Sequence, residues 1–585
     1  MPRNSHGQPP NRRDFLRSSG TAAVGLGLAL LRRGALPSGV AYALSRGGNA
    51  FAVPPTNPLN PHPILELSDL ALGPSETIGG LPFASRWHGD WFGREYIPLH
   101  SPEDGGSGGP LTEPIVDVAI IGGGLSGLAA AHLLPDAKVA LFDLRPRLGG
   151  NALGERWRGV PYSLGSAYFM VAGSGTAEDA LYHELGVYDT ARIDTPEITP
   201  FEFEGAISQD PCANCSDEMR LRYHAFRAAL AIYAGKTYPD IPMLPKSERL
   251  VRELDVSDFR SSVRAAAGGE LPPLVEASLQ AYCYSSFGVG WQELSAAAGW
   301  NFIAAEEYGR IVLPGGNAGL AALLWRKIAQ REGNAVQGTT PIARTHATVI
   351  SVEAVHGSVL IRWRDAHGRA RITQARDAVM CCPLHVARHL VTKLETLDEP
   401  KLQAMHRVES VAYVVANVLL EQPPKIDHYD IFTIHDKEFP RAGEDCEFDR
   451  RITDVLDGSF APSAGAQANA DVLTLYWPLP WHTARFSIVH DDDWRSYAEI
   501  GAPQIDRILS LVGSSRAAVK QIRMTRWGHA MSFAVPGFYG SNAPLDIQRP
   551  FEGHIHFAHQ DVWALPAWET CLAEARRVVA AIGRG

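Results

Sequence analysis

A run of glycines in the first quarter of the chain has the spacing that can hold a diphosphate. Residues 122–127, GGGLSG, fit the pattern G-x-G-x-x-G. The first glycine of this pattern permits a tight turn, the second lets a diphosphate approach the backbone, and the third lets a helix pack closely on a strand. Amides at the start of that helix then face the phosphates. We therefore predict dinucleotide contacts at Gly122, Gly124, Ser126 and Gly127.

An acidic residue stands where a ribose contact is expected. Asp143 lies about 20 residues after Gly122, at the end of a second apolar run. A carboxylate at this point accepts hydrogen bonds from ribose hydroxyls. We predict that Asp143 holds the ribose beside the diphosphate.

Apolar runs indicate the elements that must position these residues. Residues 115–121, IVDVAII, are typical of a parallel strand buried on both faces. We predict a helix over residues 125–134 and a second parallel strand over residues 138–144, which complete a βαβ unit. Residues 348–378 alternate as a β-hairpin does, and the C-terminal segment predicts a strand, a loop and an amphipathic helix.

The residues after Asp143 distinguish flavin-binding from nicotinamide-binding proteins. Arg147, Gly149 and Gly150 form an R-x-G-G segment, and here the sequence resembles the flavin amine oxidase superfamily, in which such a segment contacts the flavin nucleotide. Residues 160–169, 313–324 and 378–383 also resemble segments of that superfamily, although Ser163 stands where an acid is frequent. Within the superfamily the sequence most resembles spermidine dehydrogenase-like proteins, in residues 314–324, 413–420 and 525–533.

The resemblance implies FAD as the cofactor and further contacts to it. Val349 falls where the backbone contacts the adenine. Gln560 and Asp561 fall where an acidic pair meets the ribityl chain or the pyrophosphate, and His559 replaces a common glycine beside them.

Few side chains are required for the chemistry, because a flavin itself accepts the hydride. We predict no catalytic triad, no carboxylate pair and no metal site. Trp527, Trp563 and Trp568 either line a substrate pocket or pack in the core, and His529 either orients the substrate or flavin or is a structural histidine. These alternatives stay open on the sequence alone.

Two absences and one charged turn bear on the substrate and its electron acceptor. Glu306, Glu307 and Tyr308 either meet a distal ammonium group or form a solvated turn. Many amine oxidases place a lysine near the flavin on the strand that here spans residues 410–420, and its absence favours a dehydrogenase. No cysteine stands just before the last predicted flavin strand, so a cysteinyl link to the flavin is not indicated.

The N-terminus resembles a twin-arginine export signal. Residues 11–17, NRRDFLR, precede an apolar run at 20–31 and a small-x-small cleavage site at 41–43. The run is shorter than the about 20 apolar residues of a spanning helix, and no later segment approaches that length. We expect export to the periplasm or another extracytoplasmic space. In that oxidising environment Cys212 and Cys215 are either a local disulfide or two free thiols.

Length and charge bound the remaining possibilities. The 585 residues exceed the roughly 250–300 at which one core stops growing, so we expect two domains. A net charge of −10 argues against a nucleic-acid partner. We predict an α/β fold, α+β overall, in which a Rossmann-type FAD-binding domain with a parallel sheet and a hairpin is interleaved with a substrate domain. The predicted parts are a signal peptide (1–43), an irregular extension (44–113), FAD-binding parts (114–190, 305–390 and 521–585) and substrate-domain parts (191–304 and 391–520).

These features together predict an exported FAD-dependent oxidoreductase. We expect it to oxidise a C–N bond of an amine or polyamine by hydride transfer to flavin, with O2 or another electron acceptor as its second partner. One alternative is a desaturase or isomerase that acts on an apolar polyene or fatty chain. Another is a flavin-loaded partner protein with little turnover.

Overall fold

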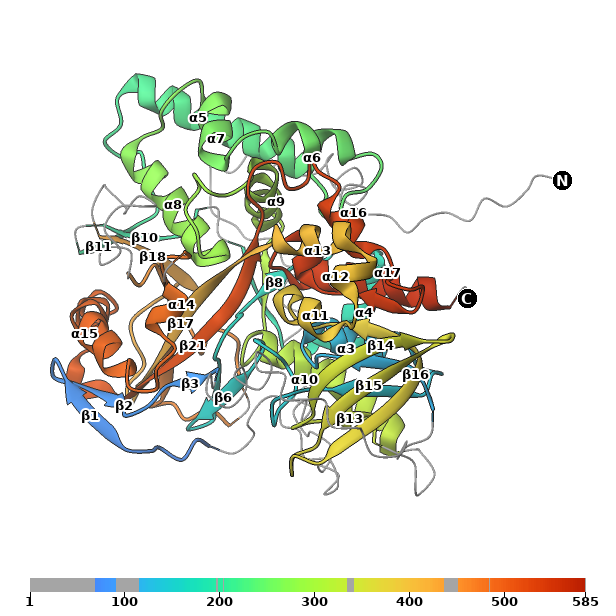
Figure 1. Ribbon diagram of the computed structural model, residues 1–585. Coiled ribbons are helices and arrows are strands. Elements are labelled where there is room, and N and C mark those ends of the chain that lie inside the picture. The colour runs from blue at the N-terminus through green and yellow to red at the C-terminus, as the bar shows by residue number, and fades with distance from the viewer. Residues whose placement is uncertain are drawn as a thin grey trace.

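The described part of the chain folds around two large β-sheets and also forms a small three-stranded and a small two-stranded sheet. The structure is a computed structural model and describes residues 69–90, 115–195, 198–203, 205–333, 341–435, 451–463, 465–482 and 484–583. The predicted signal at 1–43 and most of the predicted extension at 44–113 lie outside these residues. In Figure 1 one sheet lies at the lower right, and the longest strands of the other run diagonally through the centre.

The predicted βαβ unit forms the middle of a seven-stranded sheet. Strands β13, β5, β4 and β16 are parallel neighbours, β22 pairs parallel with β16, and β15 and β14 continue the sheet as an antiparallel hairpin. The predicted α/β architecture with a hairpin is thus confirmed. The bounds are β4 Val116–Ile121, β5 Val139–Phe142, β13 Ala343–Arg344, β14 Thr348–Val355, β15 Ser358–Arg364, β16 Ala370–Met380 and β22 Ile555–Phe557.

Burial on both faces explains the unbroken apolar character of β4. Val118 and Ile120 pack into one core with helix α3, whereas Ala119 and Ile121 join the core on the opposite face. Helix α3 is in turn covered by α10 and α17. The bounds of these helices are α3 Leu125–His132, α10 Asn317–Gly333 and α17 Trp568–Ile582.

The second sheet has ten strands drawn from distant parts of the chain. Its order is β1-β2-β21-β17-β20-β19-β18-β10-β11, and β3 also pairs with β21. Alternate residues of β17 face opposite sides, so that Val414 and Ala416 pack under helix α15 while Tyr413 and Val415 join a different core. The bounds are β1 Ser75–Ile78, β2 Leu81–Ala84, β3 His88–Gly89, β10 Phe201–Phe203, β11 Ala206–Ser208, β17 Glu409–Leu420, β18 Asp430–His435, β19 Asp454–Asp457, β20 Asp471–Pro478, β21 Val519–Phe533 and α15 Trp494–Leu511.

Two predicted boundaries differ from the structure. The described part of the predicted irregular extension forms β1, β2 and β3. Strand β21, expected in the last FAD-binding part from residue 521, belongs to the second sheet, because it pairs with β17 along most of its length. Both differences have one physical cause, since β1–β3 and β21 find their hydrogen-bond partners only in each other and in strands far away in sequence.

A group of helices covers one end of the second sheet, at the top of Figure 1. The Ser216 hydroxyl accepts a hydrogen bond from Met219 N at the start of α5, and the Asp258 carboxylate accepts one from Ser261 N at the start of α7, so both helices begin at a capping residue. The bounds are α5 Asp217–Gly235, α6 Glu248–Leu254, α7 Phe259–Ala267, α8 Pro273–Phe287 and α9 Ala296–Glu306. Next to the first sheet lie α11 Leu384–Leu390, α13 Glu399–His406 and α16 Ala543–Gln548.

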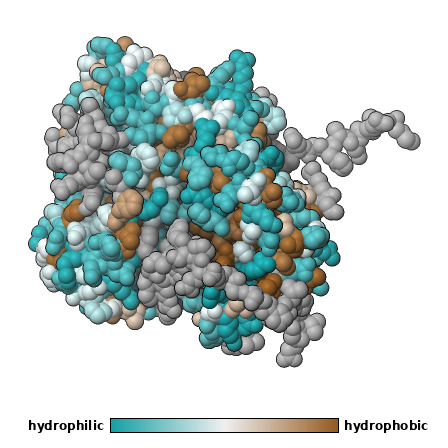
Figure 2. Space-filling view, in the orientation of Figure 1, coloured by the Kyte–Doolittle hydropathy of each residue, from teal (hydrophilic) through white to brown (hydrophobic). Residues whose placement is uncertain are grey.

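The surface and the remaining sequence features are ordinary for a folded globular chain. Hydrophilic side chains cover most of the face seen in Figure 2, and the apolar ones lie in small separate patches.

None of the described helices combines the length and the apolar character that crossing a membrane requires. Cys212 and Cys215 are joined in a disulfide. Within the described residues, no three or more His, Cys, Asp or Glu side chains are grouped as a metal site would need.

Candidate functional site

Two adjoining cavities are lined by residues of both sheets. The first, here the glycine-loop cavity, has a volume of about 270 Å³ and contains residues 122–126 and Asp143 in its wall. The second, here the aromatic cavity, has a volume of about 670 Å³. The residues that line both are Leu125, Asn151, Ser166, Ala530, Met531, Gln560 and Pro566. A ligand in the first cavity would therefore reach the second across this shared wall.

The glycine loop makes its turn where no other residue fits. Gly122 has a φ of 112°, and a Cβ on it would lie 2.7 Å from Cys381 O. A Cβ on Gly127 would lie 1.9 Å from Gly122 O, which is a backbone atom of the same turn. The loop therefore requires glycine at both ends, and it leaves the start of α3 open to the glycine-loop cavity.

Asp143 closes the loop from the end of β5. Its Oδ2 accepts a hydrogen bond from Gly123 N at 2.8 Å, and its Oδ1 accepts one from Arg145 N at 2.8 Å. Burial raises the pKa of Asp143, and the positive charge of Arg145 opposes that shift. Each oxygen keeps a further lone pair, so the carboxyl can hold the loop and still contact a sugar.

A hydroxyl in the cavity wall lacks a partner. Ser126 Oγ is buried and lines the glycine-loop cavity, and among the described residues it has no hydrogen-bond partner of normal geometry, only the weakly polar thiol of Cys571 beside it. Ser126 also belongs to the first turn of α3, where backbone N–H groups lack helical partners. A hydroxyl and free amides at a helix start are what a phosphate oxygen needs.

Most of the predicted cofactor residues come together in this cavity. Two predicted residues lie elsewhere. Gly127 acts by packing rather than by lining, and the Arg147 guanidinium makes only a long 3.5 Å hydrogen bond to Gly154 O, outside the cavity wall. Those that line the cavity are Gly122, Gly124, Ser126, Asp143, Gly149, Gly150, Val349, Gln560 and Asp561.

His559, which replaces a common glycine of the superfamily, contacts the neighbouring acid. Its Nδ1 lies 3.1 Å from Asp561 Oδ1, and Asp561 Oδ2 accepts a hydrogen bond from Leu384 N at 2.9 Å. Burial alone would raise the pKa of Asp561, but the charge and hydrogen bond of His559 outweigh it and hold that pKa at about 2. Asp561 is therefore ionised, and it holds the start of α11 against the cavity.

The four aromatic candidates separate into different places. Trp527 and Trp568 line the aromatic cavity, and His529 lines the glycine-loop cavity. Trp563 lines neither, so of its two predicted alternatives the structure agrees with packing in the core. It is 3% exposed, and its indole Nε1 donates a hydrogen bond to Glu574 Oε1 at 2.8 Å. A buried indole needs an acceptor, and here a carboxylate of α17 supplies it.

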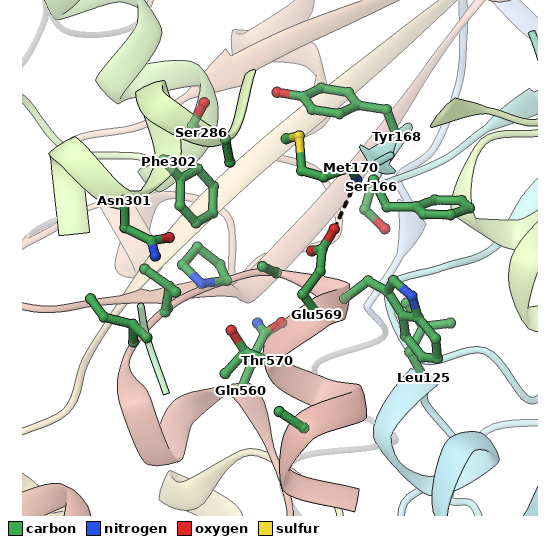
Figure 3. A pocket seen from close by; sticks show the side chains of 18 of the residues that line it. Leu125, Ser166, Tyr168, Met170, Ser286, Asn301, Phe302, Gln560, Glu569 and Thr570 are labelled. Carbon is green, nitrogen blue, oxygen red and sulfur yellow. Dashed lines mark hydrogen bonds between the residues drawn. The ribbon is translucent and has the colours of Figure 1, made fainter. Parts of the chain in front are cut away.

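Other aromatic side chains, not predicted from the sequence, complete the aromatic cavity. In Figure 3, Tyr168 and Phe302 face Gln560 and Glu569 across it, and Glu569 accepts a hydrogen bond from Met170 N at 2.8 Å. Tyr413 and Tyr476 meet edge to face, with ring centroids 5.8 Å apart. Their positions on β17 and β20 follow the alternation of those strands, but only the fold shows which side faces the cavity.

A buried group of charged side chains, here the Arg310 cluster, lies behind this aromatic wall. Arg310 is 2% exposed and pairs with Asp194, with Glu306 at 3.5 Å and with Asp430 at 2.6 Å. Asp454 belongs to the same cluster, and its Oδ2 accepts a hydrogen bond from the cavity-lining Ser285 hydroxyl at 2.8 Å. One guanidinium therefore faces four carboxyl groups.

Because the Arg310 cluster has more carboxyl groups than cations, it favours the binding of a further positive charge. Burial raises the pKa of Glu306 to about 7, although Arg310 opposes the shift. The Tyr168 hydroxyl, which reaches this group from the cavity wall, donates a hydrogen bond to Glu306 Oε1 at 3.1 Å. Burial likewise raises the pKa of Asp454 well above its usual range, and the charge of Asp430 adds to that shift.

The predicted charged turn is therefore divided. The Glu306 side chain is 17% exposed and lies behind Tyr168 rather than in a solvated turn. Glu307 is exposed and pairs with Arg227 at 3.4 Å, as in a solvated turn. The Tyr308 hydroxyl donates a hydrogen bond to Ala234 O and so connects α9 with α5.

The comparisons with known proteins give this arrangement a family. Residues 125–476 match the family model described as flavin containing amine oxidoreductase, which is more than half of the chain. The chain belongs to that family. No curated protein matches the sequence.

Solved structures of three other proteins share the fold. Putrescine oxidase bound to putrescine has a TM-score of 0.59 and 14% identity, with 81% of this chain and 100% of that chain covered. Cyclohexylamine oxidase from Brevibacterium oxydans IH-35A has a TM-score of 0.58 and 17% identity, covering 80% and 99%. A fatty acid isomerase from P. acnes that produces CLA has a TM-score of 0.56 and 15% identity, covering 80% and 98%.

The residues of the glycine-loop cavity fit FAD, and the protein is an FAD-dependent oxidoreductase. The turn at Gly122, the unpartnered Ser126 hydroxyl and the open start of α3 suit the diphosphate, and Asp143 suits the ribose. Bound there, FAD supplies the acceptor for a hydride.

Proposed function

We propose that this oxidoreductase oxidises a C–N bond of an amine or polyamine. The observation that carries the proposal is the aromatic cavity, which shares a wall with the glycine-loop cavity and has the Arg310 cluster behind it. Aromatic faces attract cations, and an excess of buried carboxyl groups favours a cationic substrate. The amine oxidases among the structural neighbours support the same substrate class.

The residues around the aromatic cavity would bind and orient the amine and keep water out. Trp527 Nε1 donates a hydrogen bond to Leu164 O at 2.8 Å, and Trp568 Nε1 donates one to the Tyr182 hydroxyl at 3.0 Å, so both rings are held in place. An apolar, aromatic surrounding disfavours the charged form of a buried amine. The reacting nitrogen would thus be neutral at the shared wall, while a second, distal ammonium could stay charged near Tyr168 and Glu306.

Anaerobic reduction of the bound flavin tests this proposal directly. The panel holds monoamines, diamines and polyamines together with amino acids, polyenes and fatty acids. We expect at least one of the amines to bleach the visible absorption band of the flavin. The bleaching rate should rise with pH toward the pKa of the substrate, because the neutral amine reacts. Bleaching by a polyene or a fatty acid, with none by any amine, would contradict the proposal.

Two neighbouring glutamates give this test a matched pair of variants. Glu306→Gln removes a buried charge next to the cavity, and we expect it to weaken the binding of a diamine by about tenfold, or about 1.4 kcal/mol, with a smaller effect on a monoamine. Glu307→Gln changes the adjacent exposed residue and should leave both affinities unchanged. If both variants change the affinities equally, Glu306 does not contribute to substrate binding.

We propose that the acceptor of the electrons is a molecule other than oxygen. The absence of lysine from β17, between Glu409 and Leu420, supports this. After reduction by an amine, the flavin should reoxidise faster with a quinone or dye than with oxygen. Fast reoxidation by oxygen alone would contradict it.

We also propose export by the twin-arginine route, which the order of charged, apolar and small residues at 11–43 supports. Replacing Arg12 and Arg13 by lysine should keep the protein in the cytoplasm, as cell fractionation would measure. Equal distribution of the original and the variant between the compartments would contradict export by this route.

A further inference from the structure

Two histidines stack on each other in the wall of the glycine-loop cavity. The rings of His385, on α11, and His529, on β21, have centroids 3.5 Å apart and planes 17° apart. Both residues line the same cavity as Asp143 and the glycine loop. His529 is flanked by Ala530 and Met531, which belong to the wall shared with the aromatic cavity. The pair is thus placed beside the path from the dinucleotide loop to the substrate side.

The surroundings keep at least one ring neutral. Burial lowers the pKa of His385 well below its usual range, and the nearby His529 lowers it further. Asp561, on the 3-10 turn Gln560–Trp563, opposes this shift, whereas Arg485 on α14 (Ala484–Ser487) and Arg388 on α11 add to it. His385 Nε2 is buried and has no hydrogen-bond partner among the described residues.

A pair of stacked imidazoles can carry one added proton, on one of the two rings, but not two. A second proton would place like charges in direct contact, which strongly disfavours it. One added proton needs only a new negative charge nearby to become favourable, because charges interact strongly in a cavity of low dielectric. The reduction of a flavin supplies such a charge.

We propose that the His385–His529 pair takes up one proton when the bound flavin is reduced and releases it when the flavin is reoxidised. In this step the flavin gains two electrons and one proton and so carries one negative charge. The second proton comes from solvent and converts one imidazole of the pair to imidazolium, which leaves the net charge of the cavity unchanged. On reoxidation, the electrons pass to the acceptor and both protons leave. The proposal concerns the cofactor alone and does not depend on an amine substrate.

The other titratable groups of the cavity wall are less suited to this task. Asp561 is ionised with a pKa of about 2 and is paired with His559. Burial raises the pKa of Cys382 and of Cys571 to about 12, so both thiols stay protonated and cannot accept a proton. Asp143 is engaged by the amides of Gly123 and Arg145. His559, the third histidine of this wall, is engaged through its Nδ1 by the Asp561 carboxylate at 3.1 Å and by the Asp561 N–H at 3.2 Å. The stacked pair is therefore the acceptor in this proposal.

Proton uptake by the FAD-loaded protein tests the proposal. The protein is reduced electrochemically, without oxygen and in weak buffer, and a pH-indicator dye reports the protons taken up per two electrons. We expect about two protons for the original protein near neutral pH and about one for the double variant His385→Gln, His529→Gln. His554→Gln serves as the control and should take up two, since His554 is half-buried, pairs with Asp377 at 3.1 Å and lines neither cavity.

The original protein also tests the proposal by itself, in case the double variant does not retain FAD. Its uptake should fall from two protons to one as the pH is raised between about 6 and about 9, while the absorption spectrum of the reduced flavin stays that of the negatively charged form. An uptake of one proton throughout this range would overturn the proposal. So would an uptake of two by the double variant, or a reduced spectrum that changes to the neutral form, because the second proton would then reside elsewhere.

Discussion

Gly127→Ala should yield a protein that is purified without its yellow colour. The added Cβ would lie 1.9 Å from Gly122 O and 3.4 Å from Ile120 Cγ2. The first of these is a backbone atom of the dinucleotide turn, so relief requires that the turn itself moves. Overpacking of this kind costs about 1–3 kcal/mol, which corresponds to about 5–150-fold weaker FAD binding if the turn yields. The flavin content per polypeptide and the dissociation constant for added FAD measure the effect.

A second glycine and a neighbouring serine separate loss of FAD from general unfolding. Gly235→Ala, at the end of α5, adds a Cβ with no atom within 4 Å, and it should retain full flavin content. Ser126→Ala removes only the unpartnered hydroxyl, and it should fold with unchanged circular dichroism while binding FAD less tightly. Normal flavin content in Gly127→Ala would show that the turn is not the diphosphate site.

The central elements of the first sheet could be predicted because they are adjacent in sequence. The strand β4, the turn at Gly122, the helix α3 and the strand β5 follow one another within a short stretch, and each part carries its own signal. Apolar residues on both faces of β4 indicate a strand covered on both sides, and the glycines indicate the turn. No distant partner is needed to predict these elements.

Much of the second sheet could not be predicted in this way, because β2, β3, β10 and β17 pair with strands far away in sequence, although hairpin neighbours such as β1 and β2 are local. β2 and β3 pair with β21, which lies more than 400 residues later in the chain. Short strands such as these carry little periodicity, and only the partner makes them strands. The same reason explains the boundary of the last FAD-binding part, which the sequence places inside a strand of the other sheet.

The residues of the candidate site also differ in whether a local sequence pattern identifies them. The residues of the glycine loop were found because a spacing identifies them, whereas Tyr168 lies in a loop, Tyr413 on β17 and Ser285 on α8, and the three share no motif. The two alternatives for Trp563 stayed open because the sequence cannot show where an indole nitrogen finds its acceptor. Here that acceptor is Glu574. Arg310 gave no signal at all, since its four acidic neighbours come from β9 Arg192–Asp194, α9, β18 and β19.

The second large effect is expected at Arg310 itself. Arg310→Met would leave Asp430, which is 2% exposed, and Glu306 without their cation. Removing one partner of a buried ion pair costs about 3–5 kcal/mol, because the remaining charge is buried and uncompensated. The control Arg249→Met breaks an exposed pair with Glu253 on α6, and such pairs contribute at most about 1 kcal/mol. Chemical denaturation of both variants beside the original protein measures the difference.

The pH dependence of this loss distinguishes an uncompensated charge from a packing defect. The folded-state pKa of Glu306 is raised from 4.5 to about 7, so its contribution to stability is present below about 4.5 and is lost as the pH rises toward 7. Without Arg310 the pKa values of the carboxyl groups in this cluster rise further, so the loss of folding stability continues to higher pH. The stability difference between Arg310→Met and the original protein should therefore grow from pH 5.5 to pH 8, and adding Asp430→Asn to the variant should recover part of it. A difference that is equal at both pH values, with no recovery in the double variant, would mean that Arg310 acts through its packing and not through its charge.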